Sequence, residues 1–269
     1  MLFRSQNIGD WFNLINQGIV RTGVSDSDSH TRIGVAGFPR NMVASPYDDP
    51  GSLSAIADTL SANVNAGRTF GTNGPMVRVT VEAASTAEVG GLELGLPTTI
   101  STNDGAVDVH VDIQSPTWID FDTVEYYINT TTTRETKTMQ HTGFGMPINV
   151  NRYKVTPDFV QTAPGDFTIN TVPVAGTSSS RFEASTTLSL TGLTQDIWVV
   201  VLVKGTDGVS RPLFPVLPSN IKQSTNPTLA DLKDGNLGED GITALAFTNP
   251  LFVDVDGGGW TAPGVQVAP

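Results

Sequence analysis

The hydrophobic pattern of this chain changes its period after Thr72, and that change constrains the fold more than any other sequence feature. Before it, apolar residues recur at three- and four-residue spacing in segments 8–18 and 50–67. Each of these segments ends at a glycine, so both predict amphipathic helices with a left-handed stop. The run GIVRTGVS at 18–25 predicts a short buried strand between them. Alternating strands and helices predict an α/β arrangement for the first part of the chain.

After Thr72 the apolar residues recur with a period of two, which is typical of strands. The strand-length runs are MVRVTVEA, AVDVHVDI, TVEYYIN, RFEASTTLSL and DIWVVVLVKG. They predict an antiparallel β-sandwich of about seven strands over 85–215, and EAASTAEVGG, where both periods are lost, marks the boundary. The Gly- and Pro-punctuated remainder, 216–269, predicts an irregular C-terminal extension packed on the preceding parts. Residues 1–84 form the first of these three parts.

Composition narrows the classes of protein that this chain can belong to. Hydrophobic residues make up 38% and charged residues 16% of the 269 residues, a balance that favours an ordered β-rich globular protein. The net charge of -12 repels nucleic acid and anionic lipid, so neither is an expected partner. No apolar stretch is long enough to span a membrane. The absence of cysteine excludes disulfides and thiolate metal ligands.

The first five residues, MLFRS, match the translation of a common sequencing-adaptor end. We therefore expect the natural gene to begin further upstream and this chain to be the C-terminal part of a longer protein. On that expectation the targeting signal is missing from the sequence. A periplasmic or secreted location is then favoured over a cytoplasmic one.

The stretch VSDSDSHTRIG, residues 24–34, contains His30, one of three histidines in the chain. An Asp-X-His at the end of a strand places its carboxylate and imidazole on the same side of the backbone, so Asp28 and His30 can converge on one cation. Carboxylate with imidazole suits Zn, Mn or Fe better than Ca or Mg. A hydrogen-bonded polar turn explains the same three residues, and spacing does not separate the two readings.

Several motifs in order carry a resemblance to a known family. SDSH, then AGFPRNMV, a helix and NAGRTFGTNGPMVRVTV resemble the end of the hydrolase part of CehA/McbA-like members of the PHP (polymerase and histidinol phosphatase) superfamily, over residues 8–83. SPTWIDFDTVEYYIN and ALAFTNPLFVDVDGGGW resemble that family's C-terminal region more weakly. The resemblance implies an α+β, mostly β chain, namely the C-terminal remnant of a PHP-type distorted α/β barrel followed by an antiparallel β-sandwich. It makes Asp28 and His30 metal ligands in a centre of two or three divalent ions.

The ligand set in this sequence is incomplete. The superfamily's His-X-His motif and its intermediate ligands belong upstream of Asp28, and no histidine precedes His30. Asp26 is a poor third ligand. His110 alternates with buried-type residues in VDVHVDI, which predicts a solvated sheet face, and His141 lies in a predicted exposed loop. We therefore expect this chain alone to be inactive.

Other residues are weaker candidates. Arg40 in FPRN can clamp an anionic substrate group bidentately, with a structural ion pair as the alternative, and Arg68 in AGRTF is a second such candidate. Asn73 in TNGP can line the mouth of the site. DVDGGGW lacks the later oxygen ligands of a calcium loop, so we interpret it as a turn.

The predicted function is metal-assisted hydrolysis of an ester, carbamate or phosphoester bond in a small-molecule substrate. The alternative comes from a different class of protein. It is a secreted or cell-surface β-sandwich binding module without catalytic activity, in which the SDSH turn is a remnant.

Overall fold

The computed structural model describes residues 5–26, 39–47, 49–129, 131–140, 147–156, 159–161, 166–206, 210 and 243–264. Its two α-helices are α1 (Ser5–Asn16) and α2 (Leu53–Asn65), and a short 3-10 helix, η1 (Pro50–Ser52), leads into α2. Both helices were predicted from the three- and four-residue spacing. Gly18 and Gly67 follow them with φ of 77° and 73°, so the predicted left-handed stops are confirmed. Neither described helix has the length and apolarity to cross a bilayer.

The first sheet, called sheet A here, contains eight of the strands in the described residues. Its path runs β1 (Arg40–Val43), β2 (Thr69–Thr72), β14 (Leu245–Thr248), β13 (Ile197–Lys204), β15 (Leu251–Asp254) and β5 (Thr99–Ser101). β13 pairs with β14 and β15 along one of its edges. Along its opposite edge β13 pairs with β7 (Thr123–Ile128), which in turn pairs with β10 (Phe159–Gln161). The strand β13 is therefore the centre of sheet A, with β7 along one edge and β14 and β15 sharing the other.

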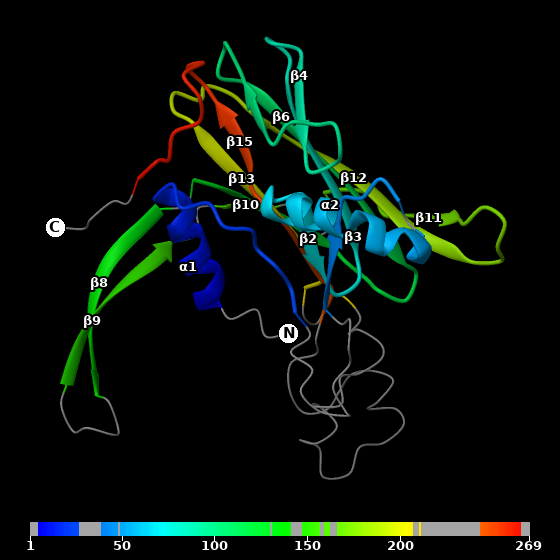
Figure 1. The fold of residues 1–269 in the computed structure, drawn as a ribbon, viewed down its shortest axis with the longest axis horizontal. Coiled ribbons are helices and arrows are strands. Elements are labelled where there is room, and N and C mark those ends of the chain that lie inside the picture. The colour runs from blue at the N-terminus through cyan, green and yellow to red at the C-terminus, as the bar shows by residue number, and fades with distance from the viewer. Residues whose placement is uncertain are drawn as a thin grey trace.

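The second sheet, sheet B, is antiparallel throughout and runs β11 (Asn170–Pro173), β12 (Ser180–Leu190), β6 (Val107–Pro116), β3 (Met76–Ala83) and β4 (Glu88–Gly91). A separate hairpin, β8 (Thr131–Gln140) with β9 (Pro147–Thr156), extends away from the two sheets beside α1 (Figure 1). Strands from both sides of residue 84 share each sheet, since β1, β2 and β3 precede it. The division of the chain into parts at that residue stays a prediction.

Two layers of apolar side chains, one on each face of sheet A, explain which side chains of the strands point inward. In β6 the inward positions Val107, Val109, Val111 and Ile113 are at most 3% exposed and alternate with polar residues, so the period-two pattern is the core pattern. In β13 both faces are buried, because sheet B covers one and α1 covers the other. The α1 layer consists of Phe12, Ile15, Trp198, Val200, Leu202 and Phe247.

The sequence-based fold is correct at the coarse level: the described residues are mostly β, with two α-helices among them. One correction concerns the strand predicted at 18–25, where residues 19–26 have no regular secondary structure. Amide side chains take the place of a neighbouring strand there. Asn249 accepts from the Gly23 N–H at 2.7 Å and donates to the Gly23 carbonyl, and Asn41 does the same for Ser25.

Three further findings differ from the expectations. Sheet A is mixed, because β15 and β5 pair in parallel. The C-terminal part is not wholly irregular, because β14 and β15 complete sheet A; each is only four residues long, too short to show a period. Neither sheet closes into a barrel in the described part of the chain, and β1 and β2, which flank α2, pair antiparallel.

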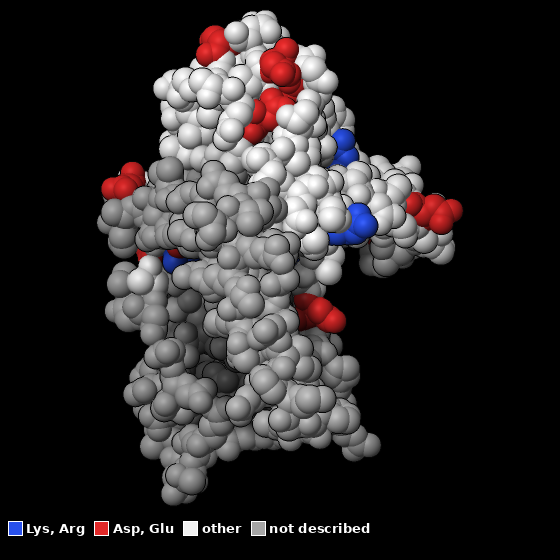
Figure 2. All heavy atoms as spheres, turned by 90° about the vertical axis from the view of Figure 1, so that its left-hand side faces the viewer, with Lys and Arg blue, Asp and Glu red and all other residues white. Residues whose placement is uncertain are grey.

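Acidic side chains on the face shown in Figure 2 lie as separate groups over the described residues, with fewer basic side chains between them. The charge excess expected from the sequence is therefore dispersed over that face.

Candidate functional site

The predicted metal ligands Asp28 and His30 lie in residues 27–38, outside the described residues. The chain on either side of that segment is fixed by one side chain. Asn41 in β1 accepts a hydrogen bond from the Ser25 N–H and donates one to the Ser25 carbonyl, each at 2.7 Å. The two ends of the segment therefore meet at one place, which we call the Ser25–Asn41 clamp.

The clamp lies at one end of sheet A, and the strand register shows which residues share that end. Arg40 pairs with Thr72, the last residue of β2, and Thr72 pairs with Ala246 near the start of β14. Asn73 follows, buried, and its side chain donates to the Thr243 carbonyl at 3.0 Å and accepts from the Leu245 N–H at 2.7 Å. Both polar atoms of Asn73 thus cross-link β2 to β14.

The two candidate arginines lie at opposite ends of the β1–β2 pair. Arg40 is exposed at the first residue of β1, next to the clamp. Arg68, just before β2, donates to the backbone carbonyls of Glu93 and, at 2.7 Å, Leu96. Arg68 therefore ties β2 to the turn after β4, and it does not share a site with Arg40.

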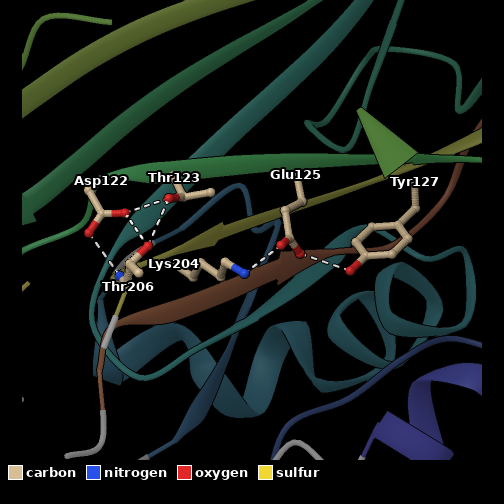
Figure 3. Close-up of polar contacts among 6 residues, drawn as sticks. All are labelled: Asp122, Thr123, Glu125, Tyr127, Lys204 and Thr206. Atoms are coloured by element: carbon tan, nitrogen blue, oxygen red, sulfur yellow. Dashed lines mark hydrogen bonds and ion pairs between the residues drawn. The ribbon is translucent and has the colours of Figure 1, made fainter. Parts of the chain in front are cut away.

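A polar cluster that the sequence reasoning missed lies where β13 ends and β7 begins (Figure 3). Asp122 accepts hydrogen bonds from the hydroxyls of Thr123, Thr206 and Ser210 and from the Thr206 N–H. Burial raises the pKa of its carboxyl, but these hydrogen bonds together outweigh burial and hold the pKa below its usual value. A carboxylate so fully occupied is an anchor for the chain after β13.

Beside Asp122 a buried carboxylate is paired across the same two strands. Glu125 is 4% exposed, and it accepts hydrogen bonds from Lys204 and, at 2.8 Å, from the Tyr127 hydroxyl. Burial, the charge of Glu125 and the hydrogen bond to it all raise the pKa of Tyr127, so this phenol stays protonated. The sequence contains a signal for this cluster, because Thr123, Glu125 and Tyr127 alternate with Val124 and Tyr126. Val124 and Tyr126 face the core between the sheets, so the three polar residues share the other face of the strand.

Three carboxylates gather at the far end of β13 and β15. Ligand oxygens of Asp196, Asp254 and Asp256 lie within 4.8 Å of one another, a set that a hard cation could use. Asp254 accepts from the N–H groups of Asp256, Gly257 and Gly259, at 2.8 to 3.2 Å. Burial raises its pKa, and these backbone amides outweigh burial and lower it. The carboxylates thus stabilise the turn that DVDGGGW predicted.

His110 lies where the alternation in VDVHVDI placed it, on the exposed face of sheet B. Its Nδ1 is 2.9 Å from the Thr187 hydroxyl, and its Nε2 is 3.5 Å from a Glu82 carboxylate oxygen. It therefore belongs to a solvated cross-strand group, as predicted. His141 lies outside the described residues.

A cavity of about 480 Å³ opens between the β1–β2 pair and sheet B. One wall carries Met42 and Phe70, and the other carries the inward-facing row Val77, Ile113 and Ala184. It lies at the end of β1 away from Arg40. A void of about 10 Å³ beside the clamp, between Ser25, Pro39 and Asn73, is too small for a ligand.

Comparisons with protein-family models, with curated proteins and with solved structures return no match.

Proposed function

We propose that this chain is the C-terminal part of a metal-dependent hydrolase that cleaves an ester, carbamate or phosphoester bond. The observation that carries the proposal is the Ser25–Asn41 clamp. It brings both ends of the segment containing Asp28 and His30 to the end of β2 where Arg40 is exposed. A polar segment held in this way at a strand end is a position from which ligands can meet. The SDSH motif supplies the chemical part of the argument.

The proposed roles follow from the donor types. Asp28 and His30 contribute a carboxylate oxygen and an imidazole nitrogen, which suit Zn, Mn or Fe. Such ions, when bound, lower the pKa of a coordinated water and polarise the bond it attacks. Arg40 orients an anionic group of the substrate through its guanidinium. Residues 1–84 are, on this proposal, the end of the distorted α/β barrel of the PHP superfamily.

Ligand number sets the limit of what the 269-residue chain does alone. A catalytic zinc takes about three protein ligands and keeps one position for water. Asp28 and His30 supply two, and Asp26 is a poor third. The remaining ligands are proposed to precede Asp28 in a longer form of the protein, so the chain of 269 residues binds metal weakly and does not turn over substrate.

The test compares metal content and turnover of an ester, carbamate and phosphoester panel in four proteins. These are the 269-residue chain, the form extended to its natural start, and the extended form with His30→Ala or His110→Ala. We expect hydrolysis only in the extended form and its His110→Ala variant, since His110 lies on a solvated face. Activity in the short chain, or full activity in extended His30→Ala, would contradict the proposal.

A second candidate function, a binding module without catalysis, is favoured by the cavity between the β1–β2 pair and sheet B. The two candidates differ in what they require of the metal motif. If the chain is a binding module, ligand uptake survives the double substitution Asp28→Ala and His30→Ala. If it is a hydrolase fragment, that double variant of the extended form loses metal and turnover.

A further inference from the structure

The cavity between the β1–β2 pair and sheet B has the size and lining of a small-molecule site. Its volume of about 480 Å³ falls within the ~300–1,000 Å³ range of ligand pockets. Apolar side chains that are not fully buried, those of Met42, Phe70 and Met76, line it, and behind them the row Val77, Ile113 and Ala184 is adjacent in the register of sheet B and packed in the core. Met76 lines the cavity and is 41% exposed, so it marks the mouth.

The charged side chains around this cavity already have partners. Arg78 binds both carboxylate oxygens of Glu93, at 2.8 and 2.9 Å, and Arg68 donates to two backbone carbonyls. A charged ligand would therefore compete with contacts that these side chains already make.

The same holds on the β12 side of the cavity. Asp112 accepts a hydrogen bond from the Ser185 hydroxyl at 2.7 Å, and Glu183 is paired with Arg181. Each charged group among the described lining residues therefore has a polar partner within the protein, and a neutral ligand enters without displacing any of these partners.

From this geometry we infer that the cavity is a binding site for a neutral, largely apolar small molecule. The described lining of the cavity does not include Arg40 or the clamp. The cavity takes residues at the Met42–Val43 end of β1, whereas Arg40 and the clamp lie at the other end. The inference does not rest on the hydrolase, and it gives the binding-module candidate a site and a ligand class. Binding is driven by removing apolar surface from water.

The test titrates the 269-residue chain with N-phenylnaphthylamine, a neutral fluorescent probe of apolar sites, and with its anionic analogue anilinonaphthalene sulfonate. We expect saturable binding of the neutral probe and weaker binding of the anionic one. Met76→Glu places a carboxylate at the mouth and is expected to weaken neutral-probe binding about tenfold or more.

Val89→Glu is the matched control, because Val89 is 39% exposed on the neighbouring strand β4 and does not line the cavity. It is expected to leave the affinity within about twofold, as distant surface changes do. Thermal unfolding of each variant checks that it is folded. No saturable binding by the folded chain, or equal loss in Met76→Glu and Val89→Glu, would overturn the inference. Tighter binding of the anionic probe would overturn the ligand class.

Discussion

Asn249 ties the segment at Gly23, which has no regular secondary structure, to β2 and to the turn between β14 and β15. It is fully buried between β14 and β15. Its side chain accepts from the Gly23 N–H at 2.7 Å and donates to the carbonyls of Gly23 and Thr69, at 3.1 and 2.7 Å. Replacing Asn249 with Ala removes all three hydrogen bonds and leaves the buried carbonyl of Thr69 and the half-buried N–H and carbonyl of Gly23 without these partners.

The size of the effect follows from those groups. An orphaned buried N–H costs about 1–3 kcal/mol, and a carbonyl costs less because it has a second lone pair. One N–H and two carbonyls together give a loss of about 3 kcal/mol in the free energy of unfolding. For a chain of this size each kcal/mol shifts Tm by about 2–4 °C, so we expect Tm to fall by about 6–12 °C.

Differential scanning calorimetry measures this change, and Asn103→Ala is the matched control. Asn103 is exposed in the turn after β5, so its substitution is expected to stay within about 0.5 kcal/mol. A second measurement follows exchange of the Gly23 amide, which should lose protection in Asn249→Ala alone. If the two variants unfold at the same temperature, the argument that amide side chains replace a strand at 19–26 is refuted.

Two further predictions concern close packing and pH. A Cβ built on Gly71 would lie 2.3 Å from the Phe247 ring, so Gly71→Ala should lower the free energy of unfolding, measured in urea, by about 1–3 kcal/mol. Adding Phe247→Leu to this variant should restore part of the loss. An unchanged urea midpoint in Gly71→Ala would contradict the close contact. The pKa of Asp122 is lowered because hydroxyl hydrogen bonds, led by that from Ser210, outweigh burial. Its contribution is therefore present above the unfolded pKa of about 3.9 and is lost as pH falls through the lower folded value. The stability gap between the wild type and Asp122→Asn should accordingly be constant near neutral pH and narrow below about pH 4, and a gap that widens in acid would show the sign to be wrong.

The sequence predicted the parts of the fold that leave a periodic pattern of apolar residues over a short stretch of the chain. The alternation in VDVHVDI predicted one buried strand face, and the spacing of Phe12 and Ile15 predicted one buried helix face. In the structure both faces are buried. The glycines after the two helices reported their ends. These patterns involve only residues that are near one another in the sequence, so they can be recognised without knowledge of the tertiary structure.

Other features depend on partners distant in sequence and were beyond that reasoning. LAFT and LFVD are too short to carry a period, and pairing with β13 and with β2 or β5 makes them strands. Asn41 and Asn249 look like ordinary loop asparagines until the backbone groups of Ser25 and Gly23 are seen against them. For the candidate site, the sequence predicted the chemistry of Asp28 and His30, and these remain a prediction. The structure added the clamp beside them and the cavity.

The position of β13 between β7, β14 and β15 has a consequence for synthesis on the ribosome. β7 is made before β13, but the two strands that pair with its other edge are made only after residue 244. A nascent chain that pauses between Lys204 and Leu245 therefore carries the most apolar strand of sheet A with one bare edge. Such an edge is a template for intermolecular pairing. We therefore expect the nascent chain to be most prone to aggregation at this stage of its synthesis.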